Sequence, residues 1–169
     1  MMTTKNRFYF LVLLFVLAPA SGNCGLLIGS HNDTTSYTPF MEAASNCDLG
    51  TVRSELEKDS TQINAKDTDM DNETALHEAV NRDCTEVTQY LLDNGADASA
   101  VKTDGITPLH LAARNGNIEI IRSLIKAKAK INALDANGWT PLDRAEKRGH
   151  QDAVEVLKQL GGREGASEP

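Results

Sequence analysis

Carboxylates at alternate positions single out one short stretch of the chain as a candidate cation site. Asp67, Asp69 and Asp71 are each two residues apart, and Glu78 follows them further along the chain. Hard oxygen ligands at such a spacing are what Ca²⁺ prefers in proteins. If these side chains converged on one point, they could hold a calcium ion.

The same stretch also has features that argue against calcium. Its spacing resembles that of an EF-hand loop, but Asn72 stands where that loop has its turn glycine, and no helix is expected to enter it. The residues from Thr74 onward also belong to a repeated motif described below. We therefore expect a solvated acidic tip. The alternative is a calcium site made by Asp67, Asp69, Asp71 and Glu78.

The remaining reactive side chains form no catalytic pattern. The four histidines are scattered along the chain, at His31, His77, His110 and His150. The sequence has no nucleophile elbow, H-E-x-x-H pair, C-x-x-C pair or phosphate-binding glycine loop. These observations predict a protein that is not an enzyme and has no cofactor.

One six-residue motif recurs at a fixed spacing. It reads T-A-L-H-E-A at Thr74–Ala79, T-P-L-H-L-A at Thr107–Ala112 and T-P-L-D-R-A at Thr140–Ala145, and each copy starts 33 residues after the one before. Apolar positions keep the same period, at Leu91, Leu124 and Leu157, and at Val87, Ile120 and Ala153. Agreement in several columns indicates a true structural repeat.

The motif and its period resemble the ankyrin repeat, a β-turn followed by two short antiparallel helices. The resemblance implies an all-α repeat solenoid of stacked helix-turn-helix units with short β-hairpin tips. Thr107 and Pro108 suit the cap and first turn of a helix, and Gly116 suits its end. Because each helix is too short to be stable alone, neighbouring repeats must stack.

A weaker copy of the motif, Thr38–Ala44, starts 36 residues before Thr74, so extra residues are expected after its helices and in its tip. Ile63–Ala65 is expected to close this repeat as a strand. The repeat domain then covers residues 37–162, divided at 37–67, 68–101, 102–134 and 135–162. The first and last repeats are more polar, as capping copies must be.

The N-terminal residues are expected to direct export. Lys5 and Arg7 precede an apolar run that ends at Ala18-Pro19-Ala20, so residues 1–20 resemble a secretory signal peptide. Residues 21–36 and 163–169 are expected to be a flexible tether and tail. An uncleaved anchor, or acylation at Cys24, is the alternative. We expect a periplasmic or secreted protein that does not insert in a membrane after cleavage.

The charge of the chain restricts its partners. The formal net charge is −7, and cleavage after residue 20 would remove two basic residues and make it more negative. Such a chain is not expected to bind nucleic acid. We expect a monomer that binds a protein whose identity the sequence does not reveal.

Three cysteines leave the pairing open. Cys47 and Cys84 fall between the two helices of the first and second copies, one residue out of step, and a bridge there could stabilise the fold by about 4 kcal/mol. Against it, stacking should place equivalent Cα atoms further apart than the roughly 7 Å that a disulfide allows. Pairing through Cys24, or three free thiols, are the other possibilities.

The resemblance further implies that partner contacts lie on the concave face, at the tips and on the exposed side of each first helix. The matching tip residues are Met70, Asp71, Glu73, Asp104, Ile106, Asn137 and Trp139. The matching helix residues are Arg82, Arg114, Asn115, Lys147 and Arg148.

Trp139 is the only tryptophan, and Trp and Arg often dominate binding energy, so Trp139 with Arg114 and Arg148 is the expected centre of the surface. The alternative is that Trp139 packs on its own repeat. The acidic first tip and the basic far helices are expected to orient a partner of opposite polarity.

Overall fold

The computed structural model describes residues 37–69 and 71–165 as an all-α repeat solenoid. The predicted signal peptide and tether, the end of the predicted tail and Met70 lie outside the described residues. The described residues contain four helix pairs: α1 (Pro39–Ser45) with α2 (Leu49–Lys58), α3 (Ala75–Asn81) with α4 (Thr85–Asp93), α5 (Pro108–Asn115) with α6 (Ile118–Lys126), and α7 (Pro141–Arg148) with α8 (Gln151–Gln159).

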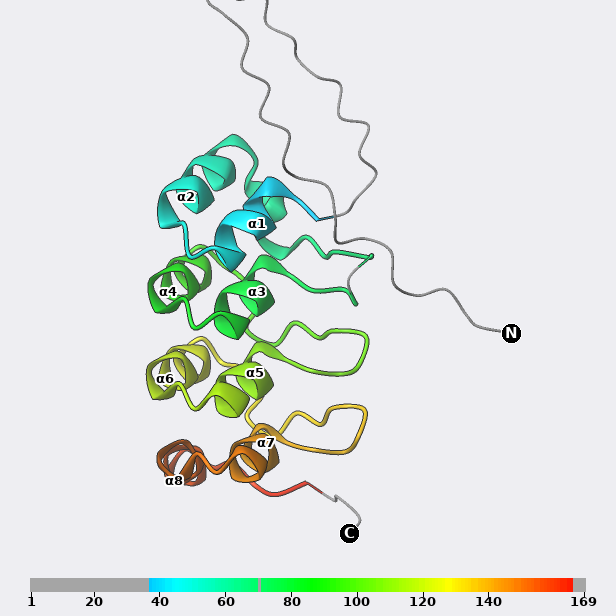
Figure 1. Ribbon diagram of the computed structural model, residues 1–169, viewed down its shortest axis with the longest axis vertical. Coiled ribbons are helices and arrows are strands. Elements are labelled where there is room, and N and C mark those ends of the chain that lie inside the picture. The colour runs from blue at the N-terminus through cyan, green and yellow to red at the C-terminus, as the bar shows by residue number, and fades with distance from the viewer. Residues whose placement is uncertain (1–36, 70, 166–169) are drawn as a thin grey trace, which may run out of the picture. The chain divides into compact units, whose positions relative to one another are not determined.

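The helices form two parallel columns (Figure 1). The inner column holds α1, α3, α5 and α7, and the outer column holds α2, α4, α6 and α8; loops that we call the tips project beyond the inner column. Each inner helix packs against the inner helix of the next repeat, and each outer helix against the next outer helix. Every repeat therefore depends on its neighbours for burial, as in other solenoids.

Threonine begins each inner helix, as the motif predicts. The Oγ1 atoms of Thr38, Thr74 and Thr140 accept hydrogen bonds from the backbone N–H three residues later. Gly116 ends α5 in the left-handed region with φ 77°. A Cβ atom there would lie 2.7 Å from the His150 ring, so this position has room only for glycine.

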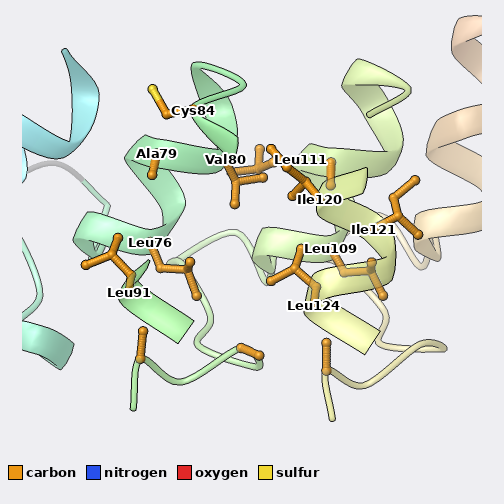
Figure 2. Packing of buried hydrophobic residues seen from close by; sticks show 14 of the residues in the cluster. Leu76, Ala79, Val80, Cys84, Leu91, Leu109, Leu111, Ile120, Ile121 and Leu124 are labelled. Carbon is orange, nitrogen blue, oxygen red and sulfur yellow. The ribbon is translucent and has the colours of Figure 1, made fainter. Parts of the chain in front are cut away.

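The periodic apolar columns make one core (Figure 2). Leu76 and Leu91 of the second repeat form one layer, and Leu109 and Leu124 of the third repeat form the next; each is at most 1% exposed. The register read from the sequence is thereby confirmed. Inner helices are lined with alanine where they meet, which allows a close approach.

The tips differ from the prediction of short β-hairpins. In the described part of the chain no strand forms at them, and the pairing is limited to one isolated antiparallel bridge, between Asp67 and Glu73. In each of the next two tips a backbone bond of 3.0 Å joins the two arms, from Lys102 N to Ile106 O and from Asp135 N to Trp139 O. One more bond lies inside each turn, from Gly105 N to Lys102 O and from Gly138 N to Asp135 O. These turns are too short for the ladder of bonds that defines a strand.

The first repeat takes up its extra residues in two places. Its tip has two more residues between the bonded positions than the other tips have, as predicted, and α2 is one residue longer than α4. The expected strand at Ile63–Ala65 is wrong, because Ser60–Asn64 forms a 3₁₀ helix, η1. The hydroxyl and backbone N–H of Thr61 both bond to Asp59, which caps this turn.

Polar side chains also form hydrogen bonds between successive repeats, in the segments that lead from each outer helix to the next tip. Asn64 Oδ1 accepts from Asp97 N at 2.8 Å, Ser99 Oγ accepts from Lys130 N at 3.1 Å, and Asn132 Oδ1 accepts from Arg163 N at 2.8 Å. These three acceptors occupy equivalent positions in successive repeats. Arg163 and Gly165, expected to be part of a flexible tail, are therefore hydrogen-bonded to the last two repeats, at Asn132 and Asp143.

A disulfide between Cys47 and Cys84 joins the first two repeats, with a Cα–Cα distance of 5.2 Å. The expected separation of stacked residues does not prevent it, because the two cysteines are not at equivalent positions. Cys47 (φ 56°) corresponds to Asp83 (φ 59°), and Cys84 is one residue further on, at the N-cap of α4. That offset shortens the diagonal between the loops to a distance that a disulfide spans.

Candidate functional site

The predicted contact residues lie on the side of the stack formed by the inner helices and the tips (Figure 1). Their exposure divides them into two groups. Those with exposed side chains are Asp71, Arg82, Asp104, Asn137, Lys147 and Arg148. Those that are half-buried are Glu73, Ile106, Arg114, Asn115 and Trp139.

Arg114 and Asn115 connect two repeats. The Arg114 guanidinium donates to Asn81 Oδ1 at 2.6 Å. The Asn115 amide donates to Val80 O, Asn81 O and Asp83 Oδ1 at 3.2–3.3 Å. Both residues therefore help to stack α5 on α3, a role that the surface pattern of the sequence did not indicate. Replacing Arg114 should affect stability more than replacing a freely exposed residue.

Glu73 and Glu78 form a carboxyl pair at the base of the first tip. Glu78 is 7% exposed on α3; burial and the Glu73 carboxylate raise its pKa to about 7. Burial also opposes ionisation of Glu73, but hydrogen bonds from Glu78 and Lys102 outweigh it and lower the pKa of Glu73. The pair thus favours one shared proton, held by Glu78.

This arrangement gives no support to the calcium alternative. Glu78 is hydrogen-bonded to Glu73 at the base of the tip. The Asp67 side chain is fully buried and accepts a hydrogen bond from Asp69 N at 2.9 Å. Over residues 37–69 and 71–165, no three His, Cys, Asp or Glu side chains are grouped so that they could hold a metal ion.

Replacing Glu78 by glutamine is expected to raise the free energy of unfolding by about 1–2 kcal/mol near pH 8 and to change it little near pH 5. The pKa of Glu78 is about 7 in the folded chain, above the usual 4.5. Glu78 therefore contributes stability that is fully present below pH 4.5, and this contribution is lost as the pH rises through 7. Denaturant titrations of the wild type and the variant at both pH values give the difference in their free energies of unfolding. The histidines titrate alike in the two proteins, so their contribution cancels in that difference.

The matched control is Glu119→Gln, at an exposed position on α6. It should show no such pH-dependent gain. A Glu78→Gln protein that is equally stabilised or equally destabilised at the two pH values would contradict a raised pKa.

Two histidines of the repeated motif have structural contacts. His110 Nδ1 lies 2.9 Å from Thr107 Oγ1, and its Nε2 lies 3.0 Å from Trp139 O of the next tip. His77 makes the same contact with Thr74, and burial lowers the pKa of His77 to about 4. His110 thus links Thr107, at the start of its own helix, to the tip of the next repeat.

Trp139 is covered by two cations of its own repeat. The Arg144 guanidinium lies 4.8 Å from the centre of the indole ring, and Lys147 Nζ lies 3.7 Å from it. Arg144 is itself fixed by an ion pair with the buried Asp135. The ring therefore packs on α7, as the alternative interpretation held. Stacking of a cation on an indole face is favourable, so the two side chains are held in place.

Beside these residues lies a pocket of about 330 Å³ between the ends of α5 and α7. It is lined by Arg114, Arg144, Lys147 and Arg148, all of them cationic. The sequence placed three of these side chains on one surface, with Arg114 and Arg148 at its expected centre, but it indicated no pocket and did not identify Arg144. Arg144 stands at the motif position that Glu78 and Leu111 occupy in the two preceding copies. Because these residue types share no chemistry, the motif predicted no role for Arg144.

Comparison with known families agrees with this architecture. The family model described as ankyrin repeats (3 copies) matches residues 12–102 and 94–165, which together are most of the chain. The chain belongs to the ankyrin repeat family. No curated protein matches it significantly.

Ankyrin repeats are protein–protein interaction modules, and the family is typically not enzymatic. The buried histidines, the inter-repeat hydrogen bonds and the apolar layers of this chain serve the ankyrin stack. The inner helices and tips retain the exposed side chains through which an ankyrin protein can bind a partner. No helix within the described ranges is long and apolar enough to cross a membrane.

Proposed function

We propose that this ankyrin protein binds a protein partner through its inner helices and tips. The proposal is supported by a difference among the predicted contact residues, since some bond to the neighbouring repeat and others do not. Arg82, Asn137 and Arg148 have exposed side chains that no hydrogen bond or ion pair engages within the described residues, while their neighbours hold the stack together. A rigid scaffold with unengaged polar side chains on one side fits a recognition surface.

We also propose that the protein acts outside the cytosol. Residues 1–20 have the charge, apolar run and small residues of a signal peptide. The disulfide between Cys47 and Cys84 supports the same location, because disulfides persist in oxidising compartments and are rare in the cytosol. The partner would then be a periplasmic or extracellular protein.

Replacing Arg82 and Asn137 together by alanine is expected to weaken binding of the partner at least about tenfold without changing thermal stability. The full chain, isolated from its native host, is used to capture the partner by crosslinking, and affinity is then measured with the purified pair. The control is Glu86→Ala with Arg122→Ala, at exposed positions on the outer helices α4 and α6. If the control weakened binding as much as the inner-surface variant, the partner would bind elsewhere.

A further inference from the structure

The pocket between α5 and α7 gathers positive charge in a chain that is acidic overall. Arg144 and Arg148 lie one turn apart on α7, Lys147 lies beside them, and Arg114 reaches the pocket from the end of α5. The formal charge of the whole chain is −7, so this group of four cations is a local reversal of its sign.

Most of this charge is not neutralised within the described residues. Arg144 is paired with Asp135. Arg114 bonds to the neutral amide of Asn81, Lys147 lies over the Trp139 ring, and no hydrogen bond or ion pair engages the Arg148 side chain. Burial, with the nearby Arg148 and Arg144, lowers the pKa of Arg114, as expected where like charges crowd together. An anion placed in the pocket would relieve this repulsion.

We propose that this pocket binds carboxylate side chains of an acidic segment in the partner protein. The proposal rests on the proposed function and names the chemistry of the partner at this site. Planar guanidinium groups donate two parallel hydrogen bonds to a carboxylate, and Arg148 presents such a group with no hydrogen bond or ion pair within the described residues, while Arg144 beside it is held by Asp135.

The size and surroundings of the pocket favour a short segment. About 330 Å³ is room for one or two side chains. Beyond the pocket the surface turns acidic, with the exposed carboxylates of Asp71 and Asp104 at the first two tips. An extended polyanion such as nucleic acid would meet repulsion there, whereas a partner that is acidic at one end and basic at the other would dock in a single direction.

The test titrates a peptide of ten glutamates into the full chain. Calorimetry measures affinity, and the fluorescence of Trp139, the only tryptophan, reports whether the peptide reaches Lys147 and Arg144 beside the ring. We expect saturable binding, a fluorescence change, and affinity that falls steeply as salt is raised. A peptide of ten lysines should not bind.

The decisive variant is Lys147→Gln with Arg148→Gln, both at exposed positions. It should weaken binding of the glutamate peptide at least about tenfold. The control, Arg122→Gln with Lys126→Gln on α6, removes the same charge from the outer helices and should change affinity less than about twofold. Equal weakening by the two variants, or no binding at all, would overturn the proposal.

Two further outcomes distinguish a carboxylate site from a phosphate site and from a pocket that the partner does not occupy. A peptide with phosphoserine in place of glutamate that bound more than about tenfold tighter would replace carboxylate by phosphate as the ligand. If the captured partner were lost on Arg82→Ala with Asn137→Ala but retained by Lys147→Gln with Arg148→Gln, the proposed function would stand and the role of the pocket would fall. Retention by both variants would overturn both.

Discussion

Replacement of Leu109 by alanine is expected to lower the free energy of unfolding by about 2–5 kcal/mol. Leu109 is fully buried in α5, in the middle of the stack, where layers above and below prevent the cavity from collapsing (Figure 2). Leu124 lies in the same layer on α6 and should behave alike. Denaturant unfolding monitored by circular dichroism gives the change directly.

The control for the core variants is Arg122→Ala, at an exposed position on α6, which should change stability by less than about 0.5 kcal/mol. Arg114 is unsuitable as a control because its side chain bonds to Asn81. Core and surface variants with similar unfolding free energies would show that the register of the third repeat is wrong.

Removal of the disulfide is expected to cost about 4 kcal/mol. Cys47 and Cys84 are 37 residues apart, and loss of the bridge restores the freedom of that loop in the unfolded chain. The variant to use is Cys47→Ala with Cys84→Ala. Serine at position 84 would confound the result, because Cys84 is the N-cap of α4 and serine is a better cap than cysteine.

A reducing agent provides the matched control. It should lower the stability of the wild type by the same amount and leave the double variant unchanged. Intact mass of protein from the native host checks the bond, since the oxidised chain is two hydrogens lighter, and the same spectrum shows whether the chain starts at Ser21. Free thiols at both positions, or equal stability with and without reductant, would contradict a stabilising bridge.

The sequence alone predicted the solenoid, because an ankyrin fold is specified by local signals that recur. Thr107, Pro108 and Gly116 set the ends of α5, and the leucine columns set which face of each helix is buried. The stack contains mainly contacts between adjacent repeats, so a constant period was sufficient to align Leu109 with Leu76.

Local signals did not predict what happens where two repeats meet. The strands expected at the tips are replaced by turns, because the described residues of each tip form only two backbone hydrogen bonds with one another. The sequence shows that Cys47 and Cys84 are one residue out of step, but only the structure shows that this offset leaves their Cα atoms 5.2 Å apart.

The sequence likewise predicted one part of the candidate site, and the tertiary structure decided the rest. The resemblance to the ankyrin repeat identified columns that face outward, among them Lys147 and Arg148, and both of these side chains are exposed. Only the tertiary structure decided that Arg114 and Asn115 bond to the preceding repeat, that Trp139 lies beneath Arg144 and Lys147, and that four cations line one pocket. Long polar side chains reach several ångströms from their backbone and choose among partners on neighbouring elements, so their contacts depend on distances between repeats that no single stretch of sequence encodes.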